Sequence, residues 1–370
     1  MIAAGDVANV TVNNLSNVQG TLQATQKLTI DTVQGLLDNT GGLITSSSDV
    51  EIHANNTINR GTKIETWVNK LDADGYPIFD DFTNTWEQEV KYSLQGIQGK
   101  NVSISTNNFD NTEGGLLANE ALIVSSTGEI DNTRGMITSH NSIDITATKV
   151  INYDGVIQST DALTLYLNNG TLDNTYGYVA SNGDITISAK TVINKRPNTG
   201  DGDFISYRLD ESGELAIDAN GNPIKYTSKN GGIRGKTVNI NSSFIDNRQS
   251  LIVASDDLRI LSDGEINNTK GRILSSGNTV IKDAVAFDDL EVQSTTPVTD
   301  TNNSSKTLSI ENSFGSISAN KSLIIDAKSL TGDGIVINNG ISIDVMQDTS
   351  FTQVKKNAEG KWVYVVDGVI

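Results

Sequence analysis

Hydrophobic residues recur with a period of about 21 residues between Leu37 and Phe287. Four segments are variations on one phrase, LDNTGGLITSSSDVEIHANNT (37–57), FDNTEGGLLANEALIVSSTGE (109–129), IDNTRGMITSHNSIDITATKV (130–150) and LDNTYGYVASNGDITISAKTV (172–192). Apolar residues occupy the first, eighth, fourteenth and sixteenth positions of this phrase. A period of this length is typical of a solenoid, in which each repeat forms one turn of the chain.

The spacing within the phrase predicts strands. The four apolar positions are Ile130, Ile137, Ile143 and Ile145 in one repeat, Leu172, Val179, Ile185 and Ile187 in another, and Ile245, Ile252, Leu258 and Ile260 in a third. One polar residue separates the last two positions, which is the spacing of a strand, and β-branched residues fill most slots. We therefore predict an all-β, right-handed parallel β-helix with about three short strands per coil and a rise of about 4.8 Å.

Two polar signatures predict the bends between strands. The sixth position is glycine in most repeats, at Gly42, Gly114, Gly135, Gly177 and Gly271, with Ser250 as an exception. Glycine adopts positive φ at low steric cost, so this position predicts a corner that needs positive φ. An Asp-Asn or Asn-Asn pair follows the first position, for example Asp131-Asn132. Stacked asparagines form hydrogen-bonded amide ladders, so this pair predicts a second, laddered corner.

The repeat is interrupted twice by about 30 residues. Both interruptions follow an Ile-Asn pair, at 58–59 and 193–194, and each contains an Asp-Gly or Asn-Gly hairpin turn, within 71–78 and 217–224. We predict a β-helix over 1–345 with hairpin insertions at about 61–95 and 195–230 and a flexible loop at about 288–306. We predict that the remaining segment, 346–370, forms a C-terminal hairpin, which either caps the helix or begins a further module.

The insertions hold most of the candidate binding residues. The first concentrates aromatic side chains in a chain that is only 5% aromatic, and the second has a weaker set. The candidates are Trp67, Tyr76, Phe79, Phe82, Trp86 and Tyr92 in the first insertion and Phe204, Tyr207, Arg208 and Tyr226 in the second. Exposed aromatic and arginine side chains are typical anchors of protein interfaces. The alternative is that these side chains only pack the hairpins against the wall of the helix.

Composition narrows the functional classes. A net charge of −18 and the lack of a basic segment argue against nucleic acid as a partner. Only 36% of residues are hydrophobic, which suits a stack with a thin core, and the absence of cysteine fits a protein that crosses a periplasm. Residues 1–6 have no charged or long apolar run, so we expect no signal peptide or membrane span, and 9–14 resembles the end of a coil, as in a fragment of a longer protein.

The phrase Asp-Asn-Thr-x-Gly-x-Ile-x-Ser, at 131–139, resembles the haemagglutinin repeats of filamentous-haemagglutinin-type exoproteins. That family includes adhesins and contact-dependent growth inhibition toxins, which Gram-negative bacteria export by two-partner secretion. The resemblance covers about 10–286 and implies a secreted or cell-surface, monomeric filament segment exported through an outer-membrane transporter. It also implies binding to an outer-membrane protein or glycan receptor on a neighbouring cell, with the insertions as contact surface. A passive stalk is the alternative.

An enzyme is the less favoured reading of the same fold. Right-handed β-helices include polysaccharide lyases and hydrolases, which need convergent carboxylates. Asp80-Asp81 and corner residues such as Asp131 and Asp173 are the candidates, but the repeat itself explains the corner residues. His53 and His140 lack a partner at metal-ligand spacing, and the calcium-like sequence at 72–75 has Thr83 at the closing position. We expect no catalytic site, metal or cofactor.

Overall fold

The computed structural model describes residues 1–70, 76–80, 85–86, 88–196, 206–207, 225–226, 231–284, 306–338, 342–345, 353–356 and 362–365. Its regular elements over these residues are β-strands, which form a parallel β-solenoid of about 12 turns with about 21 residues per coil. The predicted fold class is therefore confirmed. The chain comprises two compact units, Met1–Thr138 and Ser139–Ile370.

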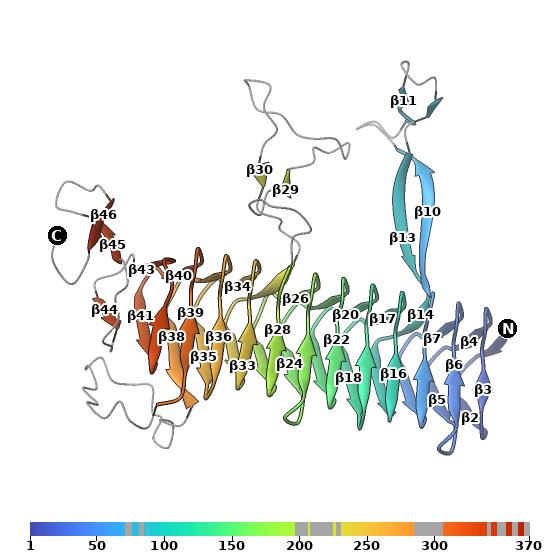
Figure 1. The fold of residues 1–370 in the computed structure, drawn as a ribbon. Coiled ribbons are helices and arrows are strands. Elements are labelled where there is room, and N and C mark those ends of the chain that lie inside the picture. The colour runs from blue at the N-terminus through green and yellow to red at the C-terminus, as the bar shows by residue number, and fades with distance from the viewer. Residues whose placement is uncertain are drawn as a thin grey trace. The chain divides into compact units, whose positions relative to one another are not determined.

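In unit 1, each coil contributes one strand to each of three parallel sheets, here named A, B and C (Figure 1). Sheet A contains β1 (Ile2–Ala4), β4 (Thr21–Ala24), β7 (Leu43–Ser46), β14 (Gly96–Gly99), β17 (Gly115–Ala118) and β20 (Met136–Ser139), the last of which ends at the first residue of unit 2. Sheet B contains β2 (Ala8–Thr11), β5 (Lys27–Asp31), β8 (Asp49–His53), β15 (Asn101–Thr106) and β18 (Ala121–Ser126). Sheet C contains β3 (Leu15–Ser16), β6 (Leu36–Asp38), β9 (Asn56–Ile58), β16 (Asn108–Asp110) and β19 (Glu129–Asp131).

Unit 2 repeats the same three-sheet plan. Sheet A contains β23 (Val156–Ser159), β26 (Tyr178–Ser181), β31 (Gly232–Gly235), β34 (Leu251–Ala254), β37 (Arg272–Ser275), β40 (Ser316–Ala319), β43 (Ile335–Asn338), β45 (Gln353–Lys356) and β46 (Trp362–Val365). Sheet B contains β21 (Ser142–Thr146), β24 (Leu163–Tyr166), β27 (Ile185–Ser188), β32 (Val238–Asn241), β35 (Leu258–Ser262), β38 (Thr279–Asp283), β41 (Ser322–Asp326) and β44 (Ser342–Val345). Sheet C contains β22 (Lys149–Ile151), β25 (Thr171–Asp173), β28 (Thr191–Ile193), β33 (Phe244–Asp246), β36 (Glu265–Asn267), β39 (Ser309–Glu311) and β42 (Ser329–Thr331).

The core consists of the four apolar positions of the repeat. Strand register places each position over the same position of the next coil, as where Ile30 pairs with Ile52 and Ile52 with Ile104. The positions are almost fully buried in both units, at Leu37, Ile44, Val50 and Ile52 in unit 1 and at Leu172, Val179, Ile185 and Ile187 in unit 2. Burying one such side chain contributes about 1.5–3 kcal/mol to stability. Because the apolar positions of the repeat are the buried ones, the 21-residue period of the sequence is also the period of the core.

The sixth-position glycines do not have the role that the sequence predicted. Positive φ occurs one residue earlier, at Glu113 (52°), Arg134 (54°) and Tyr176 (58°), so the prediction of positive φ at the sixth position was wrong. A Cβ on Gly135 would lie 2.2 Å from the backbone oxygen of Asn111, in the preceding coil. Glycine is therefore favoured at the sixth position because the backbones of successive coils approach closely, not because of its own backbone angle.

The first insertion contains a hairpin, formed by β10 (Lys63–Asn69) and β13 (Gln88–Leu94), which pair antiparallel in a sheet of their own. Lys63 lies opposite Leu94 and Asn69 opposite Gln88, so the centre of the pairing falls between Ile78 and Phe79. The predicted Asp-Gly turn at 74–75 lies outside the described residues, and the backbone N–H of Ile78 donates to the oxygen of Lys70 at 2.9 Å on either side of it. A second short pair, β11 (Phe79–Asp80) and β12 (Thr85–Trp86), lies within the connection.

The other irregular segments are described only in part. In the second insertion, β29 (Ser206–Tyr207) pairs antiparallel with β30 (Lys225–Tyr226), while its predicted turn at 217–224 lies outside the described residues. The predicted loop at 288–306 also lies outside the described residues, except for Lys306. The Lys306 side chain is buried and forms an ion pair with Asp326. The C-terminal pair β45 and β46 is antiparallel, and β45 adds to sheet A beside β43. Whether 346–370 cap the helix or begin a further module stays a prediction.

Over the described residues, no helix could span a membrane.

Candidate functional site: the corner between sheets C and A

A row of buried asparagines lines the inside of the corner between sheets C and A. The Nδ2 of Asn111, a fully buried residue, donates to Oδ1 of Asn132 at 2.7 Å, and its Oδ1 accepts a hydrogen bond from Nδ2 of Asn59 at 2.8 Å. The same contact joins Asn17, Asn39, Asn59, Asn111 and Asn132 in unit 1 and Asn152, Asn174, Asn194, Asn247, Asn268 and Asn312 in unit 2. The predicted asparagine ladder is thus confirmed, and it satisfies polar groups that the core would otherwise leave unpaired. Asn39 and the sixth-position Gly42 lie in one bend, between β6 and β7, so the prediction that they mark two separate corners was wrong.

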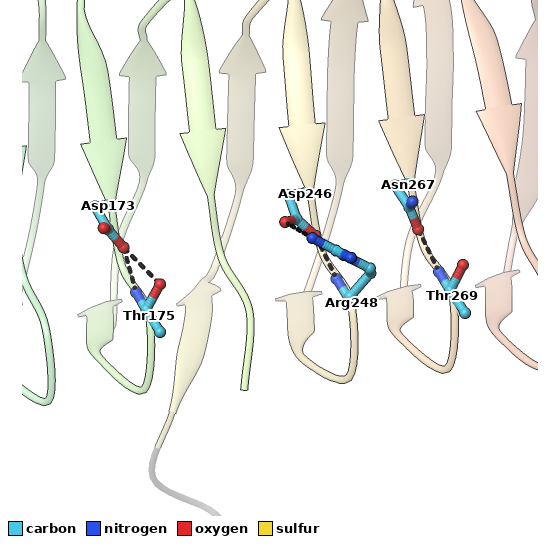
Figure 2. Close-up of polar contacts among 6 residues, drawn as sticks. All are labelled: Asp173, Thr175, Asp246, Arg248, Asn267 and Thr269. Carbon is cyan, nitrogen blue, oxygen red and sulfur yellow. Dashed lines mark hydrogen bonds and ion pairs between the residues drawn. The ribbon is translucent and has the colours of Figure 1, made fainter. Parts of the chain in front are cut away.

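In several coils the residue before the ladder asparagine is Asp or Asn, and its side chain turns the chain. Figure 2 shows Oδ1 of Asp173 accepting a hydrogen bond from the backbone N–H of Thr175 at 3.0 Å, and Asn267 making the same contact with Thr269 at 3.1 Å. Asp246 additionally binds the Arg248 guanidinium through both carboxylate oxygens, at 2.7 Å each. These are Asx turns, in which a short polar side chain fixes its own backbone. The corner carboxylates therefore have a structural role in the coils that contain them.

Both insertions begin directly after a ladder asparagine, and the ladder continues beneath them. Asn59 donates to Asn111 at 2.8 Å although 52 residues separate them, and Asn194 donates to Asn247 at 2.7 Å across 53 residues. At the base of the first insertion the backbone N–H of Gln95 donates to the oxygen of Thr62 at 2.8 Å, which closes the corner. The coils thus keep their contacts on both sides of each insertion, so the solenoid does not need these segments to close.

The structure places the candidate binding residues of the first insertion along its short strands. Tyr76 and Phe79 are exposed, by 70% and 41%. Trp67 lies in β10 opposite Val90, Trp86 lies in β12 opposite Phe79, and Tyr92 lies in β13 opposite Glu65. Phe82 lies outside the described residues. The backbone therefore brings Phe79 and Trp86 together as a cross-strand pair, and the binding role of all six residues stays a prediction.

The candidates of the second insertion are less completely placed. Tyr207 lies in β29 opposite Lys225, and Tyr226 lies in β30 opposite Ser206. Phe204 and Arg208 lie outside the described residues. The pairing brings the two tyrosines onto adjacent strands of one short ribbon, and their predicted role in binding is untested.

A groove of about 560 Å³ lies on sheet C of unit 1, at the foot of the first insertion. It is lined by Asn56, Thr57, Ile58, Arg60, Asn108, Phe109, Asp110, Glu129 and Asp131. Arg60 Nε donates to Asp110 Oδ2 at 2.6 Å, and this contact raises the pKa of Arg60. Burial alone would raise the pKa of Asp110, but hydrogen bonds from Arg60 and the Thr112 backbone hold it below its usual value. The groove therefore presents charged and amide groups immediately beside the insertion.

The Arg60–Asp110 pair predicts a pH-dependent contribution to stability. A carboxyl whose pKa is lowered by folding stabilises the protein above its unfolded-state pKa, near 3.8, and this contribution is lost as the pH falls through the folded-state value. When the pH falls from about 5 to about 3, we expect the free energy of unfolding to fall less in Asp110→Asn than in the unaltered chain. The difference between the two losses is up to about 1 kcal/mol. Urea unfolding at a series of pH values measures this, and Arg60→Gln is expected to reduce the same slope. Equal slopes in all three proteins would contradict the assignment.

The enzyme candidates that the structure describes lie at the corners of the coils and in β11. Asp131 and Asp173 each accept a backbone N–H in their own Asx turns, and Asp80 lies in β11, one residue before Asp81, which is outside the described part. His53 Nε2 contacts Glu51 at 3.0 Å on the outside of sheet B. Within the described residues, no group of three or more His, Asp and Glu side chains could hold a metal ion.

Some exposed residues at this corner were missed by the sequence reasoning. Tyr153 occupies the fourth position of its repeat, where many coils have threonine, and is 43% exposed. Its ring contacts that of Tyr176 edge to face, with centroids 5.6 Å apart. The signal that would have found them is departure from the repeat, because a residue that the architecture does not require is free to serve another purpose.

Comparison with known proteins identifies the repeat. The haemagglutinin repeat family matches residues 2–66, 97–134, 130–175, 165–222, 211–286 and 289–345. These matches extend past 10–286, the range over which the sequence resemblance was recognised. No curated protein and no solved structure matches the chain.

Proposed function

Because the chain belongs to the haemagglutinin repeat family, we propose that it is a segment of a secreted, cell-surface exoprotein that binds a receptor on target cells. The observation that carries this proposal is the uninterrupted asparagine ladder beneath the insertions. An insertion that the solenoid does not need for closure, and that concentrates aromatic residues, is more readily explained by binding than by architecture. The first insertion is the proposed contact surface.

The proposed partner is an outer-membrane protein or glycan on a neighbouring Gram-negative cell. Export of the parent protein would use an outer-membrane transporter of the two-partner secretion type, as the family resemblance implies. Adhesion and delivery of a growth-inhibiting toxin both require such a recognition step. The same repeats also suit a passive stalk, in which the insertions would have no partner.

The test is binding of the purified, fluorescently labelled chain to whole Gram-negative cells. One variant replaces Lys63–Leu94 with a short Gly-Ser link between Thr62 and Gln95, whose backbones are already hydrogen-bonded at 2.8 Å. Saturable binding by the unaltered chain (below called the parent) that is lost in this variant supports the proposal. Retention of binding would move the contact surface elsewhere, and absence of binding by the folded parent would support the stalk.

We expect Trp67→Ala combined with Trp86→Ala to weaken cell binding about 30-fold or more, because the loss of even one interface anchor costs about 2 kcal/mol or more. Circular dichroism confirms that the variant is folded. The matched control is Trp362→Ala, the third tryptophan, which lies in β46 outside both insertions. A double variant that is folded and binds like the parent would exclude the two tryptophans as anchors.

A further inference from the structure

A buried pair of charged side chains lies in unit 2, at the end of the loop predicted for 288–306. Lys306 precedes β39, and Asp326 is the last residue of β41, in the next coil. The side chain of Lys306 is only 6% exposed and that of Asp326 17%. Nζ of Lys306 contacts Oδ1 of Asp326, so the pair connects two successive coils at the corner between sheets B and C.

Burial distinguishes this pair from the other lysine ion pairs of the described residues. The side chains of Lys27, Lys100 and Lys321 also contact carboxylates, but they are between 44% and 65% exposed. A buried ion pair stabilises a protein only where further hydrogen bonds satisfy its polar atoms, because both charges lose their hydration. The environment of the Lys306–Asp326 pair therefore decides whether the two groups are stable as separate ions.

The contact between the two groups does not have the geometry of a hydrogen bond. Over the described residues, Oδ1 of Asp326 is buried and has no hydrogen-bond partner, although Nζ of Lys306 touches it. A buried oxygen without a hydrogen bond costs about 1–3 kcal/mol, and more where it is charged. The nitrogen of the lysine thus lies against the carboxyl group without the bond that would stabilise two buried ions.

The backbone holds both residues in place. Asp326 pairs with Lys282 where β41 lies beside β38. The next residue, Asp283, is fully buried, and its carboxylate accepts the backbone N–H of Thr307, which directly follows Lys306. Two groups that a fold holds in contact react as if each were present at an effective concentration of about 10⁵–10⁸ M. A condensation that is unfavourable between free side chains in water is therefore favoured at this corner, where water is largely excluded.

We infer that Lys306 and Asp326 are joined by an isopeptide bond, an amide between Nζ and Cγ. A proton passes from the ammonium to the carboxylate within the contact, because burial disfavours both charged forms. The lone pair of the neutral amine then attacks Cγ and forms the C–N bond. The bond from Cγ to the protonated oxygen breaks, and the hydroxyl leaves as water with a second proton from the nitrogen. One proton stays on the nitrogen, so an ammonium and a carboxylate become one amide and one water.

The bond links two successive coils covalently where a long segment interrupts the repeat. In a solenoid each coil contacts only its neighbours, so the opening of one interface between coils exposes the next. A link between Lys306 and Asp326 prevents these two coils from separating, and it also restricts the unfolded chain. This inference is independent of receptor binding, since it concerns only how the filament is held together.

The test is the mass of the denatured parent, measured by electrospray mass spectrometry. The linked chain is expected to be lighter than its sequence by about 18 Da, the mass of one water. Digestion with trypsin locates the bond, because trypsin does not cleave after a lysine whose amine is part of an amide. The fragment 283–321 is expected to stay uncleaved at Lys306 and to stay joined to the fragment 322–328, which contains Asp326.

Variants assign the loss of water to this pair. Lys306→Arg keeps the charge without the amine, and Asp326→Ala removes the carboxyl group, so each is expected to have the full mass of its own sequence. The matched control is Lys321→Arg combined with Asp256→Ala, which alters an exposed pair with a contact of 3.8 Å and is expected to keep the loss of about 18 Da.

Two results would overturn the inference. An ordinary ion pair gives the full sequence mass in the parent and cleavage by trypsin after Lys306. A loss of water that persists in Lys306→Arg would place the dehydration at another residue. Because the joined fragments are sought in the parent, the outcome does not depend on whether the variants fold.

Discussion

Replacing Asn111 with alanine is expected to lower the free energy of unfolding by about 3–5 kcal/mol, because it interrupts the asparagine ladder of unit 1. Asn111 is fully buried and joins Asn59 to Asn132 through hydrogen bonds of 2.8 Å and 2.7 Å. Its removal leaves Oδ1 of Asn132 without this donor and removes one of the two acceptors of Asn59, whose Nδ2 keeps its bond to Gly115 O at 2.8 Å. A buried polar atom without a partner costs about 1–3 kcal/mol, and the cavity left by the side chain adds to this.

The measurement combines urea unfolding, followed by circular dichroism, with hydrogen exchange of the backbone amides. Hydrogen exchange is needed because a solenoid behaves as a chain of neighbouring repeats, so the loss is expected to be largest in the coils that contact Asn111. Asn108→Ala is the matched control. Asn108 lies in the same coil, but it is exposed and bonds to Asn56 at 3.0 Å on the outside of sheet C, so a loss below about 1 kcal/mol is expected. Equal losses in the two variants would show that burial of the ladder is not the source of its stability.

The solenoid was predictable because its core follows a period that the sequence displays directly. The four apolar positions and the ladder asparagine recur in most coils, with exceptions such as Thr57 and Thr279, so a single repeat contains most of the information for the next. The sixth-position glycine shows the limit of this reasoning. A recurrent glycine can mean either that the position needs positive φ or that another backbone lies too close for a side chain. The sequence does not separate these two causes. The structure does, because positive φ occurs at Arg134 and the close approach occurs at Gly135.

The insertions were predictable in position but not in pairing. The interruption of the period locates them to the corner after Asn59 and Asn194, as the structure has it. An Asp-Gly turn is a local signal, however, and strand register depends on contacts along the whole hairpin. The β10–β13 pairing is centred between Ile78 and Phe79, a register that the sequence alone did not predict, and the predicted turn at 74–75 lies outside the described residues. The contact between the rings of Tyr153 and Tyr176 was not predicted for a different reason, because the two residues lie in successive coils and meet only through coil stacking.

Replacing Gly135 with alanine is expected to lower the free energy of unfolding by about 2–4 kcal/mol, because the added Cβ cannot be accommodated between coils. The Cβ would lie 2.2 Å from the backbone oxygen of Asn111 and 2.5 Å from Oδ1 of Asn132. Relief of this overlap requires either separation of two coils or displacement of the Asn132 amide, which breaks its bond to Asn111. The substitution thus damages strand pairing and the ladder together.

One coil naturally has a side chain at this position. The backbone N–H of Ser250 donates to the oxygen of Asn247 at 3.3 Å, which lies within the range of the glycine coils, 3.0 Å at Gly135 and 3.3 Å at Gly155. Thermal and urea unfolding of Gly135→Ala are compared with Gly5→Ala, where no atom lies within 4 Å of the added Cβ and a change below about 0.5 kcal/mol is expected. A loss confined to Gly135→Ala, with faster hydrogen exchange at Asn111 and Asn132, is the expected result. Similar stability of the two variants would mean that the coils separate at little cost, and that glycine at the sixth position is not required for their stacking.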